Sequence, residues 1–303
     1  MNNSKKFSTH FGPQKGRKLT TMVGVAALGA VLSTTTASAQ LSGFGNEDLV
    51  VQKNSSSVVG TNWTVNGNGC CGGGNAVEID GDTNSDTLIL GGGGGYPAGS
   101  AFANAKQAIG GFTASFTFSE PDTTNARTFA FVLQNDPRGT AARDKTNGGY
   151  AGGGAPLTLA YEIVFKNLGG AAVDGVNPDP LEVGFLQNSS TDPKSGYDAT
   201  TSSTGLNLVD GAITANLSYD GQTLTLQLVQ GTRNFLTTDT VDTKTLLGAS
   251  NGYVGFVANQ LDNGASVTNF SYTPVPEPCT ATVVLLGLGG LAGLMRIRTQ
   301  RLA

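Results

Sequence analysis

The residues of this chain with the most chemical potential are carboxylates, and four of them lie close together. Glu78, Asp80, Asp82 and Asp86 alternate with other residues, Asn84 among them, so a loop could direct several oxygen atoms at one cation. Calcium prefers such hard oxygen ligands. The segment lacks the glycine at the sixth position and the distal glutamate of an EF-hand loop. Because charge runs are usually solvated, we expect an acidic turn here, with calcium binding as the alternative.

The first 39 residues carry the signs of an export signal. Five Lys and Arg residues precede the apolar segment 22–32, and Ala37-Ser38-Ala39 is the small-residue pattern that signal peptidase prefers. We expect cleavage after Ala39. The only histidine, His10, would leave with this peptide. Catalysis by Ser-His-Asp or Cys-His groups, and zinc sites that use histidine, are therefore excluded from the mature domain.

The last thirty residues contain three signals in a fixed order. The break Pro276-Glu277-Pro278 precedes an uncharged run from Cys279 to Met295, which is followed by Arg296 and Arg298. The run is just long enough for a membrane helix, and the arginines favour a cytoplasmic end with the rest of the chain exported. This order resembles the PEP-CTERM sorting tag of Gram-negative bacteria. The resemblance implies that an exosortase-type enzyme removes residues 274–303 from the inner membrane, releasing the protein to the cell surface or extracellular matrix; a permanent anchor is the alternative.

The part of the chain between these two ends is acidic. Eight of the 18 Lys and Arg residues lie in the ends, whereas all but one of the 22 Asp and Glu residues lie between them. Such a surface disfavours nucleic acid and anionic polysaccharide as partners. The adjacent Cys70 and Cys71 could form a vicinal disulfide, join another chain or remain thiols in an oxidising compartment.

Period-two patterns dominate residues 40–273. In the segment 112–118, phenylalanine and alanine alternate with serine and threonine, and similar alternation occurs over 213–219 and 224–228. Such runs are typical of strands with one buried face. Asp220-Gly221 joins the last two runs and is a strong hairpin signal. We therefore predict one all-β domain built of antiparallel sheets.

The order of these segments resembles that of the legume-type (L-type) lectins. The resemblance rests on eight segments across nearly the whole of residues 40–273: 98–102, 111–118, 129–136, 159–163, 183–184, 219–221, 252–258 and 267–272. It implies a concanavalin A-like jelly-roll sandwich. Fold alone does not settle function, because sandwiches of this kind serve both sugar binding and glycosidase chemistry.

The resemblance also implies a calcium and transition-metal pair whose ligands begin as Glu-x-Asp on one strand. Glu162 matches the first ligand, but the bridging aspartate is replaced by Val164, and Lys166 would repel a cation. We expect the standard metal pair to be absent, which leaves calcium as the one candidate cofactor. The remaining candidate ligands of the degenerate site are Glu162, Asn167, Asp179 and Glu182.

The direct sugar contact of the family is altered too. The Ala-Asp-Gly triplet of the lectins is Ala126-Arg127-Thr128 here, and Arg127 can donate hydrogen bonds to hydroxyl groups but cannot accept them. The Gly-rich loop with Gly148, Gly149 and Tyr150 is kept. Its backbone could approach a sugar and Tyr150 could stack on one; a simple connector is the alternative.

An enzyme on the same sandwich is disfavoured. Laminarinase-like glycosidases carry Glu-x-Asp-x-x-Glu on one strand, so that two glutamates act as nucleophile and acid. Glu78-Ile79-Asp80 begins this pattern, but Thr83 stands at the second glutamate position, and Asn167 stands there when the pattern is started at Glu162.

Three candidate functions remain, and we take them in order of preference. The first is a noncatalytic, exported carbohydrate-binding protein of the surface or matrix, with extracellular polysaccharide as its partner. The second is a structural matrix protein that has kept the sandwich and lost the site. The third is a divergent glycosidase.

Overall fold

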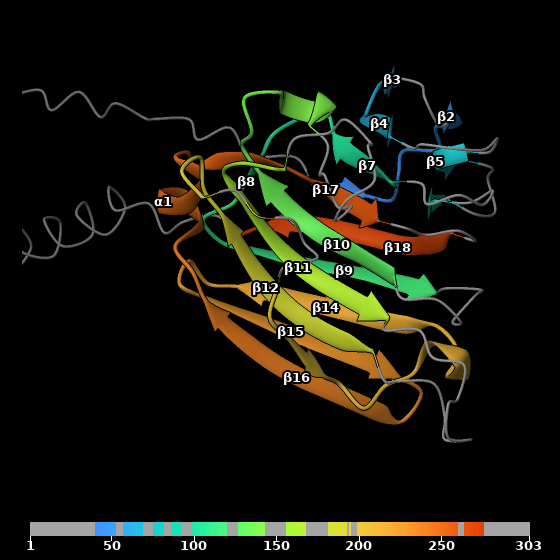
Figure 1. The fold of residues 1–303 in the computed structure, drawn as a ribbon, viewed down its shortest axis with the longest axis vertical. Helices are drawn as coiled ribbons and strands as arrows, with labels where there is room; N and C mark the ends of the chain where they lie inside the picture. The colour runs from blue at the N-terminus through green and yellow to red at the C-terminus, as the bar shows by residue number, and fades with distance from the viewer. Residues whose placement is uncertain are drawn as a thin grey trace, which may run out of the picture. The chain divides into compact units, whose positions relative to one another are not determined.

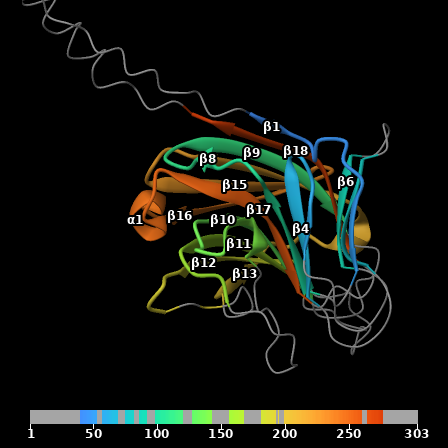
Figure 2. The same cartoon turned by 90° about the horizontal axis from the view of Figure 1, so that it is seen from above.

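Two antiparallel β-sheets make up most of the described part of the chain in the computed structural model (Figure 1). The structure describes residues 40–52, 57–68, 75–81, 86–91, 98–119, 127–142, 156–167, 181–192, 194, 199–259 and 264–275. All of them belong to one unit of the chain. Seen from above, β9, β15 and β18 lie in one layer and β10, β11 and β12 in the other (Figure 2). The predicted all-β, lectin-like sandwich is therefore confirmed.

The first layer, sheet A, begins at one edge with β16 and ends at the other with β2. Its strands in order are β16 (Arg233–Thr240), β15 (Thr223–Gln230), β14 (Ile213–Tyr219), β9 (Phe112–Ser119), β18 (Ala265–Pro274), β6 (Thr87–Leu90), β5 (Asn75–Asp80) and β2 (Leu49–Gln52). The short strand β1 (Leu41–Ser42) pairs with β18, so the start and end of the described chain lie side by side.

The second layer, sheet B, carries the candidate site. Its strands in order are β13 (Thr201–Ser203), β12 (Glu182–Asn188), β11 (Ala160–Asn167), β10 (Arg127–Gln134), β17 (Asn251–Asn259), β7 (Ala98–Ala103), β4 (Trp63–Asn68) and β3 (Ser57–Val59), with β8 (Gln107–Ala108) paired to β17. One α-helix, α1 (Thr243–Leu247), and 3-10 turns at Gly139–Ala141 and Leu208–Asp210 complete the described elements.

The core between the sheets is rich in aromatic rings. The inward residues of β9 are buried and the alternate ones are more exposed, as the period-two pattern predicts. The ring of Phe116 lies 5.1 Å from that of Phe256 and 5.8 Å from that of Phe131, which joins the two layers. Trp63 is almost completely buried and packs on Phe44 at 5.1 Å, which places it in this core.

The predicted hairpin at Asp220-Gly221 connects β14 to β15. The Asp220 Oδ1 atom accepts hydrogen bonds from the backbone N–H groups of Gln222 and Thr223, and Gly221 has a φ of +102°. Only glycine adopts such a conformation without strain, which explains the Asp-Gly sequence. The backbone donors, that of Thr223 foremost, also lower the pKa of the Asp220 carboxyl.

The acidic segment 78–86 does not form the expected turn throughout. Glu78 and Asp80 lie on strand β5, where Val77 and Ile79 point into the core. The Asp86 Oδ2 atom accepts a hydrogen bond from the Phe44 N–H at 2.7 Å. Asp82 lies outside the described residues. Within the parts of the chain that the structure describes, no three His, Cys, Asp or Glu residues gather where they could hold a metal ion.

The predicted signal peptide and sorting tag, including Pro276, Glu277, Pro278, Arg296 and Arg298, lie outside the described residues. None of the helices in the described part of the chain is long and apolar enough to span a membrane.

Candidate functional site

The outer face of sheet B, which points away from sheet A, carries polar and apolar residues in separate rows. Strand register places one polar row across four strands at the end where β10 begins. Neighbours along this row are Thr128 on β10, Lys166 on β11, Glu182 on β12 and Ser203 on β13; Asn259 on β17 pairs with Thr128, and its side chain lies outside the described set. We call these four residues the polar row. Because neighbouring strands lie about 4.8 Å apart, the polar row is about 14 Å long.

Contacts within the described chain hold two members of the polar row in place. The Lys166 Nζ atom donates a hydrogen bond to the Ala199 carbonyl at 2.9 Å. The Thr201 hydroxyl donates to the Glu182 carboxylate. Both Lys166 and Glu182 stay partly exposed. The polar row therefore presents an ammonium group, a carboxylate and the exposed Ser203 hydroxyl at the surface, whereas Thr128 is buried.

The next row along the same strands is apolar. Val164 on β11 lies opposite Ala130 on β10 and is completely buried. Ala130, Val164, Leu186 and Val257 belong to a second hydrophobic cluster on the outer face, separate from the core between the sheets. Val164 is the position of the bridging metal ligand in the lectins that the sequence resembles. A hydrophobic cluster thus occupies that position.

Glu162 is completely buried on the same outer face. Its carboxylate accepts a hydrogen bond from the Asn188 side-chain amide, and the Asn188 Oδ1 atom accepts from the Lys194 N–H at 2.8 Å. Glu162 thus ties strand β11 to the end of strand β12 and to the segment that follows it. This is a structural use of a residue that the sequence suggested as a metal ligand.

The candidate metal ligands do not gather around one point. Glu182 lies opposite Lys166, four residues along the paired strands from Glu162. At about 3.3 Å per residue this separates the two glutamates by about 13 Å along the strand. Calcium ligands lie only about 2.3 to 2.6 Å from the ion, so the pair cannot share one. Asn167 ends β11 with its side chain outside the described set, and Asp179 lies outside the described residues. With Val164 apolar, these residues do not fit the lectin metal pair.

The predicted sugar contacts are only partly placed. Arg127 begins strand β10 opposite Asn167, at the same end of the sheet as the polar row, and its side chain lies outside the described set. Gly148, Gly149 and Tyr150 lie outside the described residues. Tyr253 is an aromatic residue on the outer face, but the Lys106 Nζ atom lies 5.0 Å from the centre of its ring.

A buried carboxylate, Asp136, holds the base of the connection between β10 and β11. Arg138 donates to it through Nε at 2.7 Å and NH2 at 2.6 Å, and the Thr158 N–H and hydroxyl both donate to Oδ2 at 3.0 Å. Burial alone would raise the pKa of the Asp136 carboxyl, but these hydrogen bonds outweigh it and lower the pKa to about 2. Asp136 therefore fixes both ends of the segment that contains the Gly-rich sequence.

Sequence reasoning did not single out Asp136 as a positioning residue. Its signal is local: an acidic residue two positions after the end of a strand and directly before Pro137, with Arg138 two residues on. Because Asp side chains often bond the backbone two residues ahead, this pattern could have indicated the Arg138 contact. It could not have indicated Thr158, which is 22 residues away.

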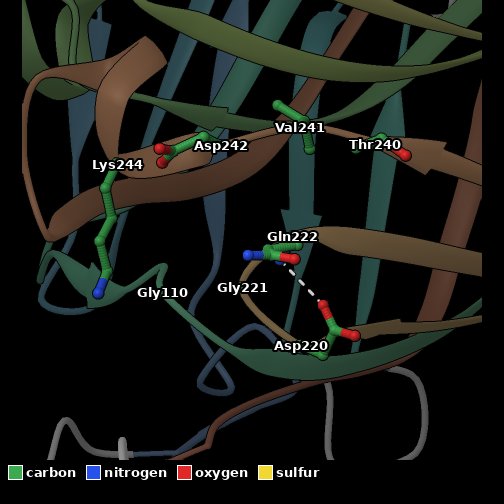
Figure 3. A pocket seen from close by; sticks show the side chains of 8 residues that line it. All are labelled: Gly110, Asp220, Gly221, Gln222, Thr240, Val241, Asp242 and Lys244. Carbon is green, nitrogen blue, oxygen red and sulfur yellow. Dashed lines mark hydrogen bonds between the residues drawn. The ribbon is translucent and has the colours of Figure 1, made fainter.

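A separate groove of about 710 Å³ lies at the opposite end of the strands (Figure 3). It is lined by Gly110, Asp220, Gly221, Gln222, Thr240, Val241, Asp242 and Lys244. The Asp220 carboxylate stabilises its hairpin, and Asp242 caps helix α1 through the Thr245 N–H. Both carboxylates of this groove are thus engaged in holding its own backbone, and none of its lining residues is aromatic.

Comparison with solved structures shows the fold of legume lectins. Lectin II from Ulex europaeus is 17% identical and matches with a TM-score of 0.50, over 75% of this chain and 99% of that chain. Lectin I from Ulex europaeus, in complex with the methyl glycoside of α-L-fucose, is 19% identical with a TM-score of 0.50, over 75% of this chain and 97% of that chain. No protein-family model matches the chain, and comparison with curated protein sequences gave no match.

Proposed function

We propose that this protein is a noncatalytic, exported carbohydrate-binding protein that binds sugar without the lectin metal pair. The observation that carries the proposal is the polar row on the outer face of a lectin-like sandwich, beside an apolar cluster at the metal position. The matching Ulex lectin I is described in complex with a fucose glycoside, which supports the ligand class.

The chemistry of the polar row suits sugar hydroxyl groups. The exposed Ser203 hydroxyl can both donate and accept hydrogen bonds, the Glu182 carboxylate accepts, and the Lys166 ammonium donates. These groups lie on paired strands and not on a loop, so their spacing is fixed by strand register. A row of this length offers contacts to more than one sugar ring, which favours an extended polysaccharide over a single monosaccharide.

A glycan array with the full-length protein tests this proposal, run once with calcium and once with a chelator. We expect binding that is unchanged by the chelator, weakened by Glu182→Gln, and kept by the control Asp192→Asn, which alters an exposed carboxylate after strand β12. Calcium-dependent binding would overturn the metal-free proposal. The absence of any glycan signal under either condition would favour the second candidate, a structural matrix protein.

The second candidate is favoured by one observation: Val164 and Glu162 have both been taken into the packing of the sandwich. A structural matrix protein of this kind would act through self-association and would not need a sugar ligand. The glycosidase alternative gains no support from the described residues, and release of reducing ends from mixed polysaccharides would be needed to revive it.

We also propose that the chain is a PEP-CTERM protein that crosses the inner membrane, is processed by an exosortase-type enzyme and reaches the cell surface or matrix. The order Pro276-Glu277-Pro278, apolar run and Arg296 supports this. Mass spectrometry of the released protein is the test: a C-terminus near Pro274 is expected. Intact residues up to Ala303 in the released protein would contradict it.

A further inference from the structure

A second cavity lies on sheet A, where strand β18 passes from one neighbouring strand to the next (Figure 2). On the side away from β9, β18 pairs with β6 at residues 265–267 and with β1 at residues 271–272. Residues 268–270 lie between these two pairings, and a bulge there interrupts the pairing with β9. A cavity of about 650 Å³ lies at this gap.

The walls of this cavity are polar and carry one charged group. They come from β18, from the end of β1 and the glycine after it, and from the start of β6. The lining residues are Ser42, Gly43, Asp86, Thr87, Thr268, Asn269, Phe270 and Ser271. Among these, Asp86 is the one charged residue, and five others have neutral hydroxyl or amide side chains. The cavity therefore surrounds a single negative charge with neutral hydrogen-bonding groups.

The Asp86 carboxylate has one oxygen atom in use and one without a partner. The Oδ2 atom accepts a hydrogen bond from the Phe44 N–H at 2.7 Å. The Oδ1 atom is shielded from water and accepts no hydrogen bond from the described part of the chain. A shielded carboxylate oxygen has lost its hydrogen bonds with water, and here the fold does not replace them. A bound ligand could supply the missing donor.

Gly43 makes room for this carboxylate. Its φ is +64°, and a Cβ atom added to it would lie 1.6 Å from the Asp86 Oδ2 atom, so only glycine fits here. Its N–H donates to the Phe270 carbonyl at 2.7 Å, which ties the chain after β1 to β18. The Asp86 side chain as a whole stays partly exposed. Because the terminal torsion of aspartate is soft, a small rotation turns Oδ1 toward the cavity.

We propose that this cavity binds a ligand that carries a protonated primary amine among hydroxyl groups, which is the chemistry of an amino sugar. The ammonium group donates to the Asp86 Oδ1 atom and neutralises the one charge of the cavity. It has three N–H donors, so hydroxyl oxygens of the walls accept the other two. The remaining wall groups pair with hydroxyl groups of the ligand.

The size and charge of the cavity favour such a ligand over a metal ion. A volume of about 650 Å³ is typical of sites for small organic molecules, whereas calcium requires six to eight oxygen ligands close around it. The acidity of the chain between its two ends favours the approach of a cation. The cavity lies on sheet A and contains no member of the polar row, so it does not depend on sugar binding there.

Calorimetry with glucosamine and the full-length protein tests this proposal, at a pH that keeps the sugar amine protonated. We expect glucosamine to bind, and N-acetylglucosamine, which has no ammonium group, to bind about tenfold more weakly or less. Equal binding of the two sugars would overturn the proposal. Displacement of glucosamine by stoichiometric calcium would also overturn it, because the cavity would then be a metal site.

Two variants of the cavity provide the second measurement. Asp86→Asn keeps an acceptor for the Phe44 N–H but removes the charge, and should weaken glucosamine binding about tenfold or more. Asn269→Asp adds a second carboxylate at a position with φ of +53°, which aspartate tolerates, and should tighten binding even if Asp86→Asn fails to fold. The control Asp192→Asn, an exposed carboxylate after β12, should bind as the native sequence does.

Unchanged binding by a folded Asp86→Asn, or weaker binding by Asn269→Asp, would show that the cavity is not the amine site. Competition separates this site from the polar row. A glycan selected on the array should not displace glucosamine, and displacement would mean that both occupy one site. Failure of array binding alone would count against the polar row and leave the glucosamine result standing.

Discussion

Strand β11 directs Tyr161, Ile163 and Phe165 toward sheet A, where all three are buried in the core. On its other side, the same strand directs Val164 into a small apolar cluster and Lys166 into the polar row. The inner face needs only apolar side chains that fill the space between two sheets, and many sequences satisfy this. The outer face needs particular oxygen atoms at particular places to hold metals. The inner face of β11 therefore carries the packing of the sandwich, while its outer face has an apolar side chain, Val164, at the position where the lectins that the sequence resembles have a metal ligand.

The largest effect is expected from a cavity in the inner face. Phe116→Ala removes a buried ring that contacts Phe131 and Phe256 across the two sheets, and should lower the free energy of unfolding by about 3 to 5 kcal/mol. Urea unfolding measures it. The control Thr117→Ala, one residue along and on the opposite side of β9, should cost about 1 kcal/mol, the net value of its hydrogen bond with Thr214. An equal loss of unfolding free energy in the two variants would contradict the distinction between the inner and outer faces of the sheet.

A charge placed in the outer cluster should have the next largest effect. Val164→Asp restores the residue type of the lectin metal site, but puts a carboxylate among apolar side chains with no designed partner. We expect a loss of about 3 kcal/mol in unfolding free energy. Val164→Ala, which removes volume without adding charge, is the control. Recovery of stability on addition of calcium to the aspartate variant would contradict the proposal of sugar binding without the metal pair.

Acid should reduce the stability that Asp136 provides through its hydrogen bonds with Arg138 and Thr158. The folded pKa is about 2, below the ordinary value of 3.8, so the unfolded chain takes up the proton first as the pH falls. The stabilisation of about 2 kcal/mol is therefore fully present above about pH 4 and is lost as the pH falls toward 2. Thermal unfolding of the wild type should show this slope, and Asp136→Asn should reduce it. The control Asp192→Asn should leave the slope unchanged.

The smallest effect on stability is expected in the polar row. Glu182→Gln keeps an acceptor for the Thr201 hydroxyl, and its partly exposed charge contributes less than about 1 kcal/mol. The same variant should weaken glycan binding strongly. Calorimetry with an array-selected glycan, next to thermal unfolding, separates the two quantities. A large stability loss without a change in affinity would assign Glu182 to the fold.

Local patterns were sufficient for much of the fold. The alternation in β9 and the Asp220-Gly221 hairpin depend on neighbouring residues only, and both are found as predicted. The expectation for Glu78 and Asp80 was wrong because the buried Val77 and Ile79, which alternate with them, impose strand geometry on the segment. The prediction of a turn rested on the charge of this segment, whereas the period-two alternation of its residues determines its strand structure.

The site required information that no local pattern contains. The polar row exists because strand register brings Thr128, Lys166 and Glu182 together from three strands, and a shift of one residue in any pairing would turn a side chain to the other face. The 13 Å separation of Glu162 from Glu182 likewise follows from register. Resemblance indicated which residues to compare, but only their pairing shows that they cannot act on one ion.

The pairing of β1 with β18 sets Leu41 opposite Tyr272 and Ser42 opposite Ser271. Cα atoms in such a pair lie within about 5.5 Å of each other, a gap that a short peptide can bridge. The backbone of this sandwich is thus close to a closed ring. A circularly permuted protein, with these two ends joined and new termini in the connection between β10 and β11, would have its strands in a different sequence order. It should still bring the same residues together.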